Sequence, residues 1–157
     1  MPLRLVFFGT PAFAVPSLLA LAATDHPVVA VVTQPDRPRG RGHKVSASPV
    51  KEAAARLRIT TLQPERLKDP TVAAHLRGLA PDLGVVAAYG KILPADLIAL
   101  PRLGMINVHA SLLPRWRGAA PIHRAVIAGD AVTGVTIMRV VPALDAGPML
   151  ATIETPI

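Results

Sequence analysis

The sequence contains no cysteine among its 157 residues. A disulfide-stapled scaffold, a zinc–thiolate site and a cysteine nucleophile are therefore excluded. Aromatic residues make up only 3% of the chain, so leucine, valine, isoleucine and alanine must build the core. No uninterrupted apolar run reaches the roughly 18 residues of a membrane-spanning helix, and the turn at residues 9–11 breaks the first apolar run too early for a signal peptide. We therefore expect a cytoplasmic, soluble protein without a membrane partner.

The common phosphate-binding motifs are also missing. Gly9 follows an apolar run, but the residues after it lack the second and third glycines of the dinucleotide-binding fingerprint. There is no Walker motif either. The histidines show no metal-ligand spacing with carboxylates. We therefore expect no NAD, no FAD, no ATP and no metal.

The chain does contain apolar runs that alternate with alanine- and leucine-rich segments, punctuated by 17 prolines. The predicted strands are 3–8, 28–33, 59–62, 83–88, 105–109, 134–141 and 149–153. The predicted helices are 12–23, 49–57, 70–77, 94–99 and 121–128, with Ser48 and Asp69 as N-caps of the second and third.

Strands that are apolar on both faces and alternate with helices predict an α/β domain with a mostly parallel sheet and helices on both faces. The last two strands are joined by only a short connection, so we expect them to form an antiparallel edge. Residues 34–48 are predicted as a loop, because their prolines and glycines disfavour regular structure.

Positive charge is concentrated in two short segments. The chain has a net charge of +7. Residues 36–51 hold five basic residues against one acidic residue, and residues 107–124 hold three basic residues and no acidic one. These segments account for the whole excess. They indicate either an anionic partner, such as a nucleic acid, or simply two solvated loops.

The residues best suited to chemistry lie at the end of the fifth predicted strand and in the loop after the sixth. Asn107 and His109 are two positions apart, so their side chains share one face about 7 Å apart. They end a strand, where open α/β sheets bind ligands. An amide and an imidazole can both donate to a carbonyl oxygen as it becomes negative, which suits acyl transfer. Asp145, in a loop of small residues, is a third candidate that could orient His109 or accept a proton from an attacking amine.

Structural roles compete with this interpretation. A histidine at a strand end is more often a satisfied structural group, and Asp-Ala-Gly more often forms a turn. Ser111 does not lie in a nucleophile elbow, so a serine nucleophile is only weakly supported.

Several segments together resemble the methionyl-tRNA formyltransferases, over essentially the whole chain. They are FGTP at 8–11, TQPDRPRGRG at 33–42, NVHASLLPRWRGAAPI at 107–122 and LDAGP at 144–148. The Asn-x-His, Ser-Leu-Leu-Pro and Leu-Asp-x-Gly elements are shared with other folate-dependent formyltransferases. The arginine- and glycine-rich loop and Trp116-Arg117-Gly118 are more specific to the enzymes that act on tRNA.

The resemblance implies a Rossmann-like formyltransferase fold and transfer of a formyl group from 10-formyltetrahydrofolate to methionine on initiator tRNA. Asn107, His109 and Asp145 match the catalytic trio of the family. The residues matching its folate site are Ser111, Leu112, Leu113, Pro114, Tyr89, Lys91, Ile92 and Leu93, with the loop 141–145. The residues matching its tRNA-binding insertion are Arg37, Arg39, Arg41 and Lys44.

The resemblance also implies a domain organisation. Residues 1–157 would form a formyltransferase catalytic domain that is incomplete at its C-terminal end, without the C-terminal tRNA-binding β-barrel domain of the family. We expect a monomer for the complete protein. Two alternatives stay open: a folate-dependent formyltransferase acting on a small amine of the purine or sugar-nucleotide pathways, and a non-catalytic RNA-binding module.

Overall fold

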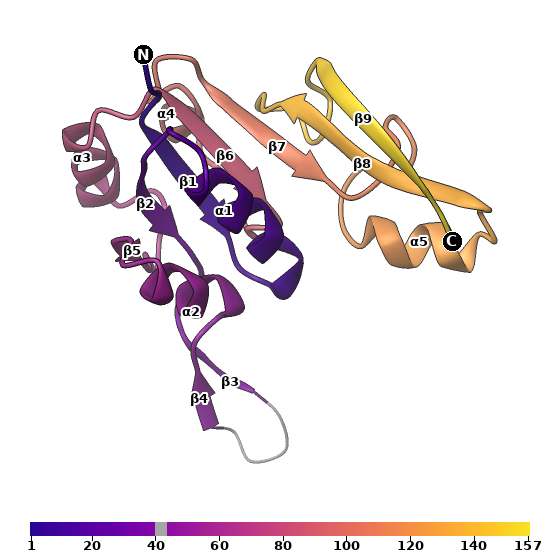
Figure 1. The fold of residues 1–157 in the computed structure, drawn as a ribbon, viewed down its shortest axis with the longest axis horizontal. Helices are drawn as coiled ribbons and strands as arrows, with labels where there is room; N and C mark the ends of the chain where they lie inside the picture. Colours follow the sequence, from indigo (N-terminus) through magenta and orange to yellow (C-terminus); the bar gives the residue numbers. More distant parts are fainter. Residues whose placement is uncertain (40–43) are drawn as a thin grey trace.

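A computed structural model describes residues 1–39 and 44–157. Its centre is a sheet in the order β5-β2-β1-β6-β7-β8-β9 (Figure 1). The strands are β1 (Leu5–Gly9), β2 (Val28–Val32), β5 (Thr61–Leu62), β6 (Leu83–Ala87), β7 (Met105–His109), β8 (Val132–Arg139) and β9 (Met149–Pro156). The sheet is parallel from β5 to β7, and β8 and β9 add to it antiparallel. The predicted parallel sheet with an antiparallel edge is confirmed.

Short helices connect these strands. They are η1 (Ala12–Ala14), α1 (Val15–Ala22), α2 (Pro49–Arg56), α3 (Pro70–Gly78), α4 (Ala95–Ile98) and α5 (Pro121–Ile127). The side chain of Ser48 accepts the backbone N–H of Lys51, and that of Asp69 accepts the N–H of Thr71. Both predicted N-caps are therefore confirmed. Among the described residues, no helix has the length and apolar character needed to cross a bilayer.

The core lies on both faces of the sheet, as the alternation of β1 requires. Phe7 is fully buried on the face that packs against Leu18 of α1. Its neighbour Phe8 is fully buried on the opposite face, with Leu76 of α3 and Leu97 of α4. Helices thus cover both faces of the sheet.

The prediction of a structureless loop over residues 34–48 is wrong. Arg37–Arg39 forms β3 and Lys44–Ser46 forms β4, and the two pair antiparallel. Pro38 is tolerated because each strand of a two-stranded ribbon has one side without a partner. The hairpin projects from the body of the protein beside α2 (Figure 1).

Candidate active site

Asn107 and His109 end β7, the strand at which the sheet changes from parallel to antiparallel pairing. Val108, between them, packs into the core on the opposite face. The alternation expected from the sequence therefore places the amide and the imidazole on the same side of β7.

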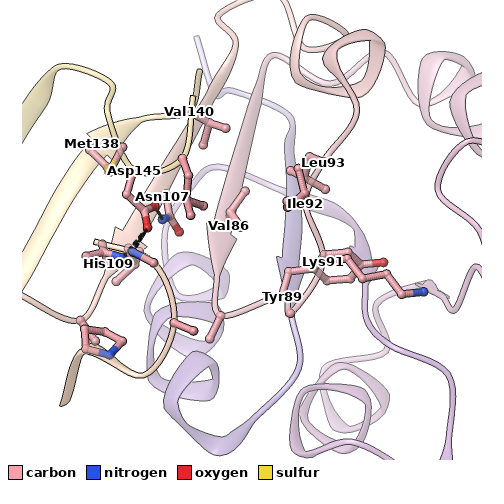
Figure 2. Close-up of a pocket in the computed structure, with 18 of the residues that line it drawn as sticks. Val86, Tyr89, Lys91, Ile92, Leu93, Asn107, His109, Met138, Val140 and Asp145 are labelled. Carbon is pink, nitrogen blue, oxygen red and sulfur yellow. Dashed lines mark hydrogen bonds and ion pairs between the residues drawn. The ribbon is translucent and has the colours of Figure 1, made fainter. Parts of the chain in front are cut away.

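Asp145 meets both of these side chains from the loop between β8 and β9 (Figure 2). Asn107 Nδ2 donates to Asp145 Oδ1 at 3.4 Å. His109 Nδ1 lies 3.6 Å from Asp145 Oδ2, a separation at which the two form an ion pair when the imidazole is protonated. The side chains of His109 and Asp145 are only 7% and 11% exposed. The structure thus brings together three groups that lie up to 38 positions apart in the chain.

The backbone around Asp145 is closely fixed. Asp145 has a φ of 44°, in the left-handed region that side chains rarely adopt. Two residues on, a Cβ at Gly147 would overlap the carbonyl oxygen of Arg139 at the end of β8. Glycine at this position therefore allows the loop to fold tightly onto β8 and aim the carboxylate at β7.

The second ring nitrogen of His109 is held by the loop that follows β7. Nε2 lies 3.0 Å from the backbone carbonyl oxygen of Trp116. Because a carbonyl can only accept, Nε2 carries a proton and donates it. The imidazole is therefore fixed between the Trp116 carbonyl and the Asp145 carboxylate.

All three groups line a cavity of about 650 Å³. Tyr89, Lys91, Ile92 and Leu93 line it as well, as does the loop at 141–145. In Figure 2 the segment that carries Lys91 and Ile92 lies across the cavity from Asp145 and His109. Val86, Ile98, Met138 and Val140 add apolar surface between these walls. Within residues 1–39 and 44–157, no three His, Asp or Glu side chains gather as a metal ion would require.

Ser111, Leu112, Leu113 and Pro114 do not line this cavity. Ser111 is fully buried, and its Oγ donates to the carbonyl of Arg115 at 2.6 Å. Thr136 of β8 donates to the carbonyl of Ser111 at 2.7 Å and accepts the N–H of Leu113 at 3.1 Å. The two contacts of Thr136 hold the loop after β7 against β8. Thr136 was not predicted from the sequence, although its hydroxyl occupies a buried position of a strand with alternating burial.

Three of the basic residues predicted to bind tRNA belong to the strands of the β3–β4 hairpin. Arg37 is exposed. Arg39 and Lys44 occupy paired positions on the two strands, and Arg41 lies outside the described residues. The two strands of this hairpin lie on an arm separate from the seven-stranded sheet (Figure 1).

Asp36 anchors the base of this hairpin. Its carboxylate accepts Lys51 Nζ of α2 at 2.6 Å and Gln63 Nε2 at 2.7 Å. The hydrogen bond from Lys51, followed by that from Gln63, lowers the pKa of the Asp36 carboxyl. Gln34 extends the anchor by donating to the carbonyl of Tyr89 in the cavity wall at 3.2 Å. The arm and the cavity are thus connected by hydrogen bonds.

The fold and this site define a formyl transferase domain. The family model described as formyl transferase matches residues 3–157, so the chain belongs to that family. It is 60% identical over 148 residues to the methionyl-tRNA formyltransferase of Methylococcus capsulatus, across 94% of this chain and 48% of that protein. It is 59% identical over 156 residues to the methionyl-tRNA formyltransferase of Pseudomonas syringae pv. syringae, across 99% of this chain and 50% of that protein. The chain spans about half the length of the curated relatives it matches.

A solved structure shows the same fold. Glycinamide ribonucleotide transformylase 1 from Geobacillus kaustophilus is similar with a TM-score of 0.79 at 27% identity, over 100% of this chain and 84% of that chain. The formyltransferase fold expected from the sequence is confirmed.

Proposed function

We propose that this chain carries the catalytic site for transfer of a formyl group from 10-formyltetrahydrofolate to the amino group of methionine on initiator methionyl-tRNA. The observation that carries the proposal is the meeting of Asn107, His109 and Asp145 at the wall of one cavity. The methionyl-tRNA formyltransferases that share about 60% of the sequence support the choice of substrate. We place the reaction in the cytoplasm and expect the complete protein to act as a monomer.

The cavity suits the formyl donor. Its volume of about 650 Å³ is typical of small-molecule sites, and its apolar walls suit a flat heterocycle. Tyr89, Lys91, Ile92 and Leu93 would form one side of the donor site, and residues 141–145 the other. Ser111, Leu112, Leu113 and Pro114 would contribute by supporting the loop that holds His109. When bound, 10-formyltetrahydrofolate supplies the formyl group.

The trio would act on the carbonyl of that group. Asn107 uses one Nδ2 proton on Asp145, which leaves the other for the formyl oxygen. As the methionine amine forms its bond to the formyl carbon, Asn107 would donate this free proton to the formyl oxygen, and His109 would share its Nε2 proton between the Trp116 carbonyl and the same oxygen. Both would thereby stabilise the negative charge that the oxygen gains. Asp145 accepts the proton that the amine loses and passes it, through water, to the folate nitrogen as the old carbon–nitrogen bond breaks.

The β3–β4 hairpin would bind the tRNA. The phosphates of the tRNA would be contacted by the basic residues of this segment, which are Arg37, Arg39, Arg41 and Lys44. Positive side chains bind phosphates by neutralising their charge. The anchor at Asp36 would hold this arm at a fixed position relative to the cavity.

A formyl-transfer assay with the complete gene product tests the proposal. We expect formyl-methionyl-tRNA from 10-formyltetrahydrofolate and initiator methionyl-tRNA, and none after His109→Ala. The likeness to glycinamide ribonucleotide transformylase 1 makes a small amine the second candidate, so glycinamide ribonucleotide is offered in a parallel reaction. Formylation of that amine alone would move the assignment to the second candidate. RNA binding without transfer to either acceptor would identify a binding module.

A further inference from the structure

We propose that Asp130 is a positioning residue for His109 and acts through Trp116. The inference rests on the formyl transfer proposed above, because it gives the orientation of His109 a consequence for rate. Asp130 lies in the turn between α5 and β8 and does not line the cavity that holds His109. Its influence on the reaction must therefore pass through other residues.

The carboxylate of Asp130 holds two neighbouring side chains of the loop after β7. Trp116 Nε1 donates to Asp130 Oδ2 at 2.7 Å. Arg115 donates from Nη2 to Oδ1 at 2.6 Å and from Nε to Oδ2 at 3.2 Å. The guanidinium also lies over the indole, 4.8 Å from the ring centroid. Asp130 thus fixes both the edge of the indole and the cation that covers its face.

Trp116 needs such support because of its backbone. Its φ is 59°, in the left-handed region that is a genuine outlier for a bulky side chain. Conformations of this kind persist only when the surrounding contacts determine them. In this conformation the Trp116 carbonyl lies 3.0 Å from His109 Nε2. The indole is therefore held by Asp130 while the backbone of the same residue holds the imidazole.

Replacing the Asp130 carboxylate by an amide weakens the contacts that keep the indole in place, because it removes the negative charge and leaves one acceptor oxygen for three donors. The backbone of Trp116 then relaxes toward a more favourable conformation, and its carbonyl leaves His109 Nε2. The imidazole keeps its contact with Asp145 and loses the one on its opposite side. A ring held at one nitrogen can tilt, and tilting of about 1 Å at a reacting group slows catalysis by up to about 100-fold.

The test is Asp130→Asn in the complete gene product, with Asp82→Asn as the matched control. Both aspartates pair with an exposed arginine: Asp130 is 15% exposed beside Arg115, and Asp82 is 21% exposed beside Arg102. Two measurements need no substrate: the solvent exchange rate of the His109 Nε2 proton by NMR, and the fluorescence of Trp116, the one tryptophan in the sequence. The third measurement is the separation of kcat from KM in formyl transfer.

We expect Asp130→Asn to shift the Trp116 emission and to speed exchange of the His109 proton by about tenfold or more. We expect kcat to fall about 10- to 100-fold, while KM for the formyl donor and for the tRNA changes by less than about threefold. Asp130→Glu should recover part of kcat. Asp82→Asn should leave all of these quantities at their wild-type values.

An unchanged exchange rate, or a kcat within about twofold of wild type, would overturn the inference. If Asp130→Asn does not fold, Trp116→Phe removes the indole N–H, with one ring of the indole, from the same tether and must show the faster exchange and lower kcat. If the wild-type protein transfers no formyl group, the proposed function fails, while the exchange rate still decides whether Asp130 positions His109.

Discussion

The carboxylate of Asp145 accepts the backbone N–H of Gly118 at 2.8 Å, which joins the loop between β8 and β9 to the loop that follows β7. Gly118 has a φ of 83° and so presents this N–H from a conformation that favours glycine. The same carboxylate also meets Asn107 and His109. Its orientation is therefore set by the protein before any substrate arrives, which is the arrangement that efficient catalytic groups require.

The first prediction concerns the groups at the end of β7. Asn107→Ala and His109→Ala each remove a proposed donor to the formyl oxygen, so each should lower kcat about 100-fold or more. Asp145→Asn should lower kcat more than it weakens folate binding, because it removes a proton acceptor while the side chain keeps nearly the same size and shape. The measurements are steady-state formyl transfer and folate binding by calorimetry. Near-normal rates in both alanine variants would refute the assigned roles.

The second prediction concerns the approach of Gly147 to β8. In Gly147→Ala the new Cβ would overlap the Arg139 carbonyl, so the loop must move and carry Asp145 with it. We expect a loss of about 1–3 kcal/mol in the free energy of unfolding and a fall in kcat of up to about 100-fold. Gly78→Ala is the control, since nothing lies within 4 Å of its Cβ position. The same free energy of unfolding in urea and the same kcat in both variants would show that the loop accommodates a Cβ at Gly147 without moving Asp145.

The third prediction concerns the charged hairpin. The variant replaces four basic residues with glutamine: Arg37, Arg39, Arg41 and Lys44. It should bind tRNA more weakly. A plot of the logarithm of its binding constant against the logarithm of salt concentration should be less steep than that of the wild type, by about three in slope. Binding titrations across a salt series measure both. The control variant replaces four exposed basic residues on or near α2 and α3, which are Arg56, Arg66, Lys68 and Arg77. If both variants lose the same affinity, net charge alone attracts the tRNA and the hairpin has no special part.

The fourth prediction concerns Tyr89, the one tyrosine in the sequence. Burial raises the pKa of Tyr89 to about 12, whereas an unfolded tyrosine has a pKa of about 10. Above pH 10 the unfolded chain therefore releases this proton first. Its contribution to stability is complete below about pH 10 and is lost as the pH rises through about 12. Urea unfolding across this range and the ultraviolet absorbance of tyrosinate measure the two effects.

Tyr89→Phe provides the control for this prediction. The Tyr89 hydroxyl has no hydrogen-bond partner among the described residues, so its removal should cost little stability at neutral pH. The loss of stability at alkaline pH that Tyr89 causes should disappear in the variant. A native tyrosine that titrates near pH 10 would contradict the burial of this hydroxyl.

Local patterns predicted much of the fold. The bounds of β7 and the caps at Ser48 and Asp69 agree with the structure, because alternation and N-capping depend on neighbouring residues. The predicted ends of the last two strands were less accurate: β8 begins at Val132, and β9 continues to Pro156. Pairing between these strands extends regular structure into residues whose own preferences are weak.

Other features depend on contacts that no local pattern reveals. The β3–β4 hairpin forms despite Pro38, because pairing outweighs the local preference for a turn. The carbonyl that holds His109 belongs to Trp116, and it meets the imidazole from a left-handed backbone conformation that no sequence pattern indicates. Asp130 meets Trp116 across 14 positions of sequence and belongs to no recognisable motif. Asp145 could be predicted from the sequence as a partner of His109, but the contact between His109 and the Trp116 carbonyl could not.

The order of the strands in the sheet also bears on the order in which a growing chain can assemble this site. From β6 onward, each new strand adds next to the one before it, through β7 and β8 to β9. A chain that leaves the ribosome N-terminus first therefore presents these strands in the order in which they lie side by side in the sheet. Tyr89 is synthesised before Asp145, so a nascent chain has one wall of the cavity before it has the opposite wall, which carries the carboxylate.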